Sequence, residues 1–234
     1  GNGFVCVMKR EPGSECRTSI HRGKIYIHTN SGAPNWRIDV MDIEGALHGD
    51  LIAKTLIPEG EFPIDEFTLI GDHLFVSSLE NVHSVLRDYN LEGEFLRELS
   101  LPAIGSGGGF SSEKEGTELF YSFSSFAFPR VVYRLDLKSG VSEIFKKIQA
   151  TFDVNMIETE QIWYQSKDGT KIPMFLIHKK GIERNGNNPA VLYGYGGFNI
   201  SITPGFLPNI IPFLERGGVY AIANIRGGGE FGKQ

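Results

Sequence analysis

Three stretches in the first two thirds of the chain share one pattern of short apolar runs and polar turns. This repeat constrains the fold more than any other feature of the sequence. The first runs of the three units begin at residues 24, 73 and 118, so their starts lie 49 and 45 residues apart. A second apolar run follows each of them and leads into a turn, with an Asp or Asn at the same place. The first runs are Lys24–Thr29, His73–Ser78 and Glu118–Phe123. The second runs are Trp36–Ile43, Ser84–Leu91 and Val131–Leu137. The Asx residues are Asp42, Asn90 and Asp136.

A period of about 45 residues with four short strands per unit is typical of a β-propeller blade. Each blade has two apolar faces that must stack on neighbouring blades, which explains why such a unit is repeated. An immunoglobulin-like sandwich also has short strands at regular spacing and is the structural alternative. The matched order of strand, strand and Asx turn favours the propeller. Because three blades do not close a ring, we expect further blades in a larger protein.

Composition excludes several classes of function. The 234 residues are 41% hydrophobic and 22% charged, as in an ordinary globular protein. The net charge of −5 argues against nucleic-acid binding, which requires a basic face. We find no apolar stretch that would span a bilayer, no signal peptide and no Cys/His cluster for a metal, and we expect no cofactor. The two cysteines are too few for a disulfide framework, so we expect a cytoplasmic protein.

After about residue 150 the pattern changes. Two strand-like runs, Gln161–Gln165 and Ile172–Ile177, flank Asp168-Gly169, a pair typical of a type I′ hairpin turn. Because proline cannot donate a hydrogen bond to a neighbouring strand, we expect Pro173 either on an edge strand or at the beginning of its strand. The sequence therefore predicts an antiparallel pair that leads into a mixed sheet.

A strand–helix–strand unit follows this pair. Ala190–Tyr193 reads as a buried strand, Pro208–Arg216 as a short helix with Asn209 as its cap, and Val219–Asn224 as a second buried strand. Gly217-Gly218 would end the helix. Buried strands joined by a helix indicate a parallel pair.

The segment after the first of these strands, Tyr193-Gly194-Tyr195-Gly196-Gly197-Phe198-Asn199, combines glycines with aromatic residues. Glycine permits positive φ and close approach of another group. A phenol in such a turn can donate a hydrogen bond to a reacting carbonyl, as in the oxyanion hole after the third strand of α/β-hydrolases. The alternative is a tight turn whose aromatic residues fill the core.

Three ordered motifs resemble the prolyl oligopeptidase family of serine peptidases. They are Ser166–Met174, Leu192–Asn199 and Ala223–Gly232. The resemblance is strongest from residue 159 onward and remains colinear through the repeat region. Oligopeptidase B, a relative specific for basic residues, is similar in the same region, but its turn usually has Ser-Tyr where this chain has Gly197-Phe198. The proline-specific branch is therefore favoured.

The resemblance implies a peptidase that cleaves short peptides after proline, with an α/β-hydrolase domain capped by a seven-bladed propeller. Residues 1–149 would be the last, four-stranded antiparallel blades, and residues 150–234 the N-terminal part of the hydrolase domain. By resemblance, Tyr195 stabilises the oxyanion and Phe198 lines the proline pocket. The family is also expected to be monomeric, with peptides as partners and neither nucleic acid nor membrane.

The family's Ser, Asp and His triad lies C-terminal to the glycine-rich turn at 227–229. The chain begins at Gly1 without Met and ends at Gln234, so we expect a fragment that is inactive alone. No Gly-x-Ser-x-Gly elbow occurs; Ser106, between two glycines, is the nearest imitation and is expected in a flexible turn. The histidines are expected mostly as ordinary surface or turn residues, at His21, His28, His48, His73, His83 and His178.

Two rival functions come from other classes. Gly227, Gly229 and Gly232 match a Gly-x-Gly-x-x-Gly dinucleotide fingerprint, which would require a helix to open there. Arg226 and Glu230 are expected to pair and brace this turn instead. The third hypothesis is a non-catalytic propeller that binds a protein partner. Tyr195 and its glycines distinguish the enzyme, because a scaffold does not require them.

Overall fold

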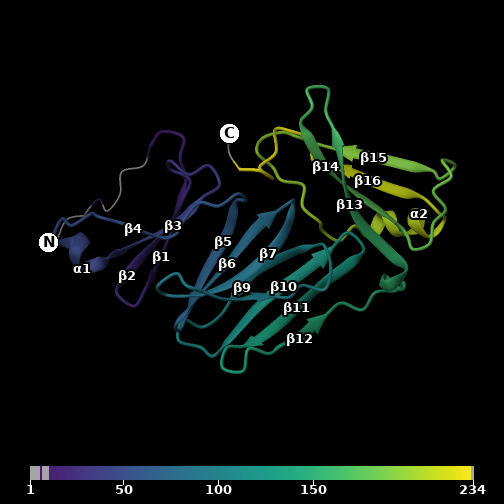
Figure 1. Ribbon diagram of the computed structural model, residues 1–234. Helices are drawn as coiled ribbons and strands as arrows, with labels where there is room; N and C mark the ends of the chain where they lie inside the picture. The colour runs from purple at the N-terminus through teal and green to yellow at the C-terminus, as the bar shows by residue number, and fades with distance from the viewer. Residues whose placement is uncertain (1–5, 7–10, 233–234) are drawn as a thin grey trace.

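The computed structural model describes residue 6 and residues 11–232. The two termini, Gly1 and Gln234, on which the expectation of a fragment drew, lie outside this range. Figure 1 shows three sheets following one another along the chain and a fourth sheet beyond them. Among the described residues, no helix is long and apolar enough to cross a membrane.

The first three sheets are four-stranded antiparallel meanders in chain order. Their second strands begin at the three positions where the repeat was recognised, so the predicted repeat is confirmed. Because consecutive strands stay in one sheet, the arrangement is that of propeller blades and not of a sandwich. The strands are β1 Cys16–His21, β2 Lys24–Thr29, β3 Arg37–Asp42 and β4 Lys54–Ile57; β5 Ile64–Ile70, β6 His73–Glu80, β7 His83–Asn90 and β8 Phe95–Leu99; and β9 Ser106–Ser111, β10 Glu118–Ser125, β11 Phe128–Asp136 and β12 Ser142–Lys147.

The repeated Asx residues end the third strand of each sheet by binding the backbone of the next turn. Asp42 accepts a hydrogen bond from the N–H three residues on at 2.9 Å, and Asp136 does the same at 2.7 Å. Asn90 accepts from the N–H groups two and four residues on, at 3.1 and 2.8 Å. A short polar side chain that closes a turn on its own backbone explains why the repeat keeps Asp or Asn there. After Asp42 the turn is a short helix, α1 Ile43–Leu47.

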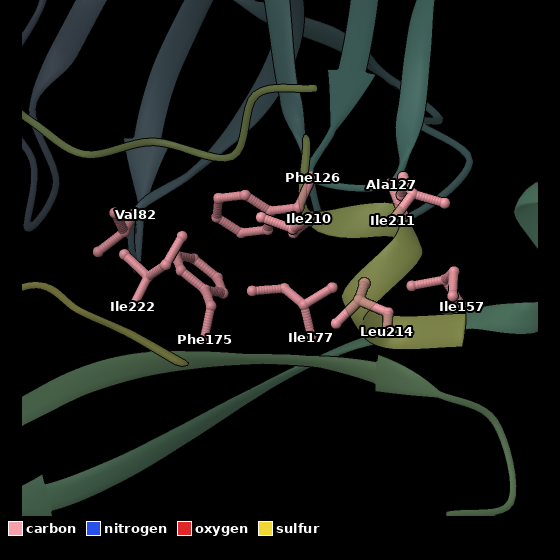
Figure 2. Packing of buried hydrophobic residues seen from close by; sticks show 10 residues of the cluster. All are labelled: Val82, Phe126, Ala127, Ile157, Phe175, Ile177, Ile210, Ile211, Leu214 and Ile222. Atoms are coloured by element: carbon pink, nitrogen blue, oxygen red, sulfur yellow. The ribbon is translucent and has the colours of Figure 1, made fainter. Parts of the chain in front are cut away.

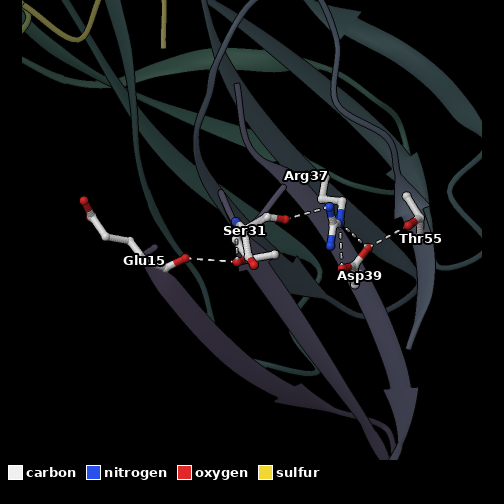
Figure 3. Close-up of polar contacts among 6 residues, drawn as sticks. Glu15, Ser31, Arg37, Asp39 and Thr55 are labelled. Atoms are coloured by element: carbon white, nitrogen blue, oxygen red, sulfur yellow. Dashed lines mark hydrogen bonds and ion pairs between the residues drawn. The ribbon is translucent and has the colours of Figure 1, made fainter. Parts of the chain in front are cut away.

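Polar contacts also cross the first sheet (Figure 3). The Arg37 guanidinium donates from Nε to Asp39 Oδ2 at 2.8 Å and from Nη1 to the Ser31 carbonyl at 2.9 Å. Thr55 on β4 donates to the other oxygen of Asp39 at 2.8 Å. Asp39 is buried, and these donors satisfy its carboxylate, as a buried charge requires.

The sheets stack face to face through apolar side chains. Tyr26, Ile38 and Leu56 of the first sheet pack with Leu69 and Leu74 of the second. The opposite face of the second sheet packs on the third through a cluster that contains Ile70, Phe75, Leu86, Leu99, Leu119, Tyr121 and Leu135. The middle sheet is thus covered on both faces, as a propeller blade must be.

The fourth sheet is mixed and has the order β13-β14-β16-β15. Its first three members in this order are antiparallel neighbours, and β15 runs parallel to β16. This confirms the antiparallel lead-in and the strand–helix–strand unit. The elements are η1 Val154–Met156, β13 Ile157–Gln165, β14 Lys171–Lys179, β15 Ala190–Gly194, η2 Pro208–Ile210, α2 Ile211–Glu215 and β16 Val219–Ala223.

Several local predictions for this sheet were wrong. In the β13–β14 turn only Gly169 has positive φ, +83°, so the turn is not type I′. For Pro173 the second of the two predicted alternatives holds: it lies near the beginning of β14, which is not an edge strand because it lies between two others. Asn209 does not cap the helix, because Leu207 holds the cap position without a side-chain bond. β15 was predicted to be buried but is exposed along its whole length: it is the edge strand, and its side chains are uncovered on both faces of the sheet.

The fourth sheet joins the blades through one apolar cluster (Figure 2). Val82 and Phe126, from hairpin turns of the second and third sheets, lie against Phe175 of β14 and Ile222 of β16. The ring centroids of Phe126 and Phe175 are 5.3 Å apart. The Leu207 N–H also donates to the Phe126 carbonyl at 2.9 Å. Hairpin turns of the blades therefore form part of the mixed sheet's core.

The stacked faces predict where the blades are sensitive to truncation. We expect Phe75→Ala to lower the free energy of unfolding by about 3–5 kcal/mol, because this fully buried ring lies between two sheets. Phe95→Ala, on an outer strand of the same sheet where the ring is 57% exposed, is the matched control and should cost less than half as much. Urea unfolding followed by tryptophan fluorescence measures both. Equal losses would contradict this account of the stacking.

Candidate functional site

The glycine–aromatic segment forms a tight turn directly after β15. Gly196, Phe198 and Asn199 have φ of +59°, +54° and +56°, and the Ile200 N–H closes the turn on the Gly197 carbonyl at 3.0 Å. Phe198 and Asn199 pay a conformational cost that Gly196 does not, because left-handed backbone is unfavourable for residues with a Cβ. The turn therefore needs support from its surroundings.

Two glycines let a second loop approach this turn. A Cβ at Gly196 would lie 2.5 Å from the Arg226 carbonyl oxygen and also against the Ile225 side chain. Conversely, a Cβ at Gly227 would overlap the Gly196 carbonyl oxygen. The two backbones are thus in direct contact at a place where no side chain larger than hydrogen fits.

Hydrogen bonds fasten the two loops together. The Asn199 N–H donates to the Gly227 carbonyl at 3.0 Å. The Ile202 N–H donates to a carboxylate oxygen of Glu230 at 2.9 Å, and the Asn224 amide donates to the Ile202 carbonyl at 2.8 Å. Glu230 and Asn224 are both buried. The loop after β16 therefore holds the turn in its left-handed conformation.

This arrangement presents both predicted site residues to solvent. The Tyr195 side chain is 42% exposed and Phe198 is 90% exposed, so neither fills the core. Beside them, a cavity of about 640 Å³ lies between the β13–β14 hairpin and the loop after β16. Asn199 contributes to its wall, whereas Tyr195 and Phe198 do not. An exposed phenol is available as a hydrogen-bond donor, and an exposed ring is available for an apolar group.

The predicted pairing of Arg226 with Glu230 is wrong. The Glu230 carboxylate faces the Ile202 N–H and the Asn224 amide, as described above, while the Arg226 guanidinium forms an ion pair with Asp168 in the β13–β14 turn. The Arg226 guanidinium, together with the Thr170 N–H, holds the pKa of the Asp168 carboxyl well below its usual range.

The rival dinucleotide site is not supported by the geometry. Through Gly232, the last residue described, no helix begins after β16. Gly227 packs on the Gly196 carbonyl, and Gly229 faces the Asn199 carbonyl. The glycine run therefore accommodates the neighbouring turn and does not open toward a phosphate.

Ser106 lies within strand β9 and not in a flexible turn, which corrects the sequence prediction. Its hydroxyl is buried and has no hydrogen-bond partner. Strand pairing with β10 fixes its backbone, since Ser124 lies opposite it in the register. A hydroxyl in this setting is not presented to a substrate.

Three of the six histidines are buried, contrary to expectation: His21, His28 and His178. The His21 ring contacts the Gly71 carbonyl at 2.8 Å. The His28 ring stacks on Trp36 with centroids 4.4 Å apart, and its Nε2 donates to the Ile64 carbonyl at 3.2 Å. Sequence patterning missed His21 and His28 because each pairs with a backbone carbonyl that is distant in sequence. The His178 ring instead contacts the carbonyl of the adjacent Lys179 at 3.0 Å.

One cluster of potential metal ligands was also missed. Glu158 and Glu160 of β13 and His178 of β14 have ligand atoms within 4.8 Å of one another. Strand register could have found them, because Glu158 lies opposite His178 and Glu160 is two residues on, on the same face. The Arg184 guanidinium pairs with Glu160 here and lowers the pKa of its carboxyl.

Comparison with known proteins agrees with this fold. The family profile described as the N-terminal β-propeller domain of prolyl oligopeptidase matches residues 2–148, more than half of the chain. The chain therefore belongs to the prolyl oligopeptidase family, as the three motifs predicted.

Individual relatives support this assignment. The chain is 38% identical over 213 residues to a prolyl endopeptidase of Elizabethkingia miricola, which covers 90% of the chain and 29% of that protein. It is 35% identical over 227 residues to a prolyl endopeptidase of Dictyostelium discoideum, covering 92% of the chain and 30% of that protein. The chain thus spans about 30% of the length of these relatives.

Solved structures show the same similarity. A chain from a study of two prolyl endopeptidases and inter-domain dynamics has a TM-score of 0.89 and 35% identity, covering 97% of this chain and 33% of that one. Prolyl oligopeptidase B from Galerina marginata, bound to a 25mer macrocyclization substrate, has a TM-score of 0.86 and 29% identity, covering 94% and 31%.

Burial of His28 predicts a pH dependence of stability. Burial lowers the pKa of this imidazole to about 4, below its value of about 6.5 in the unfolded chain. The unfolded state therefore binds the proton more readily, so stability should fall as the pH drops from about 6.5 toward 4, by up to about 3 kcal/mol. We expect His28→Gln to have a shallower slope in this window in urea unfolding at a series of pH values. An unchanged slope would contradict the assignment.

Proposed function

We propose that this chain is part of a serine endopeptidase that hydrolyses short peptides on the C-terminal side of proline. The observation that carries the proposal is the Tyr195–Asn199 turn, which exposes a phenol and an aromatic ring from one braced stretch of backbone. The similarity to proteins named prolyl endopeptidase supports it. So does the peptide complex of the Galerina marginata relative, since it shows that a family member binds a peptide.

We also propose a division of the chain near residue 149. Residues 1–149 would be the last blades of a propeller, which the family profile and the three meander sheets support. Residues 150–234 would be the beginning of an α/β-hydrolase domain. The parallel pair β15–β16, its short helical crossover and the turn at the carboxyl end of β15 support this part. The described residues hold a single such crossover, not a complete hydrolase fold.

In the proposed mechanism, a serine outside this chain attacks the carbonyl carbon of the substrate proline while a histidine removes the serine proton. The bond to the next residue's nitrogen then breaks, the histidine returns the proton to the departing amine, and water releases the proline from the serine. The Tyr195 hydroxyl donates to the oxygen that becomes negative in the tetrahedral intermediate. The Phe198 ring covers the pyrrolidine of the substrate proline, because a flat apolar face fits that ring. No metal or cofactor takes part in these steps. The 234 residues by themselves would be inactive, since the triad lies elsewhere in the longer protein.

We also propose a monomeric enzyme of the cytoplasm, because two cysteines in 234 residues are too few for a disulfide framework and favour a reducing compartment. A propeller over the site would admit slender peptides and exclude folded proteins.

Tyr195→Phe tests the oxyanion role. In the full-length protein we expect turnover of a proline-containing peptide to fall about 10²–10³-fold, as for loss of one oxyanion donor. Tyr193→Phe is the matched control, because this tyrosine is equally exposed but lies on β15 before the turn. Steady-state kinetics measures both, and unchanged turnover in Tyr195→Phe would refute the assignment.

Phe198→Ala tests the proline pocket. We expect kcat/KM to fall more for a peptide with proline before the scissile bond than for one with alanine there, because only proline uses the ring. A competition assay with the two peptides measures the ratio. Equal losses for both peptides would mean that Phe198 is structural.

A further inference from the structure

We propose that Arg226 and Asp168 are positioning residues for the Tyr195 turn: their ion pair fixes the loop after β16 on which that turn rests. This inference rests on the proposed function, because it assigns a catalytic consequence to a structural link. It extends the site to the β13–β14 hairpin, 27 residues before Tyr195 in the sequence.

The first step is the attachment of Arg226 to the hairpin. Its guanidinium forms an ion pair with Asp168, and its two Nη atoms lie 3.4 Å from Thr170 Oγ1 and 3.3 Å from Ser166 Oγ. All three acceptors belong to one five-residue turn. A planar guanidinium with several donors in fixed directions suits such a set, whereas a lysine ammonium does not.

The turn that receives Arg226 is itself well defined. The Ser166 N–H donates to the Thr170 carbonyl at 2.9 Å, and the Gly169 N–H donates to the Ser166 carbonyl at 2.9 Å. The Thr170 N–H donates to the other carboxylate oxygen of Asp168 at 3.1 Å. The hairpin below it is a continuous antiparallel ladder of nine residue pairs. Arg226 is therefore anchored to a rigid element.

The second step leads from Arg226 to Tyr195. The Arg226 carbonyl faces Gly196, and the next residue, Gly227, accepts the hydrogen bond from Asn199. The loop thus contacts the turn on both sides of Phe198, and Gly196 adjoins Tyr195. A shift of Arg226 would be passed to the phenol through direct backbone contact. Misplacement of a catalytic group by about 1 Å can reduce a rate about 10²-fold.

Stability alone does not explain these contacts. The side chains of Arg226 and Asp168 are 61% and 49% exposed. Exposed ion pairs contribute little to the free energy of folding, because water and salt screen them. The ion pair would therefore act by fixing the position of the loop after β16. Its loss should affect catalysis more than the free energy of unfolding, unlike the loss of a core contact.

The test uses Asp168→Asn in the full-length protein, with Asp168→Glu as the conservative variant. Asp72→Asn is the matched control, because Asp72 forms an exposed ion pair with Arg22 at a propeller turn. We expect Asp168→Asn to lower kcat at least 10-fold with little change in KM or melting temperature, Asp168→Glu to recover part of the loss, and Asp72→Asn to behave as wild type. Hydrogen exchange at the Asn199 amide should accelerate in Asp168→Asn only.

A double-mutant cycle with Tyr195→Phe decides whether the pair acts through the phenol. If it does, Asp168→Asn should slow turnover much less in the Tyr195→Phe background than in wild type. Full additivity, or Asn199 exchange and kcat equal to those of Asp72→Asn, would overturn the inference. If Tyr195→Phe alone has no effect, the proposed function fails, while the exchange measurement still reports on the link between Arg226 and the turn.

Discussion

Apolar stacking between hairpin turns and a sheet holds this molecule together at its most consequential point. Val82 and Phe126 project from the hairpin turns of their blades and pack against Phe175 and Ile222 of the mixed sheet. The face of the mixed sheet that carries Phe175 and Ile222 therefore shares its core with the blades. The non-glycine Val82 even adopts a φ of +70° there. Because blade turns and sheet share these contacts, the position of the Tyr195 turn relative to the blades is set by side-chain packing and not by the linking chain.

The repeat and the strand order were predictable from sequence because each depends on local signals. Short apolar runs and Asx residues before turns are signals that act within a few residues, and the structure places β2, β6 and β10 where they indicated. Exposure was not predictable in the same way. An apolar run such as Val191–Tyr193 looks like a buried strand, yet its burial depends on what covers the two faces of the sheet, and the β15 side chains are exposed on both.

The candidate site shows the same division between local and long-range information. The glycines in Tyr195–Phe198 were enough to predict a turn. Whether its aromatic rings face outward or fill the core was left open by these residues, and only the resemblance of three motifs to a family favoured the outward orientation. Arg226 and Glu230 are close in sequence, but this did not predict their partners. Arg226 pairs with Asp168, 58 residues away, and Glu230 accepts a hydrogen bond from Ile202, 28 residues away. Buried His28 and the Glu158, Glu160 and His178 cluster were missed for a related reason, since cross-strand neighbours decide both. Strand register, once known, recovers the cluster.

The mutual contact of Gly196 and Gly227 has a consequence for engineering this fold. Gly196 and Gly227 are 31 residues apart in the sequence, but each backbone occupies the space that a Cβ on the other would need. The two loops can therefore change only together. A loop exchange intended to alter selectivity would have to transplant both segments as a matched set. Grafting Tyr195–Asn199 alone onto a scaffold with a bulkier second loop would displace the aromatic residues that the graft was meant to supply.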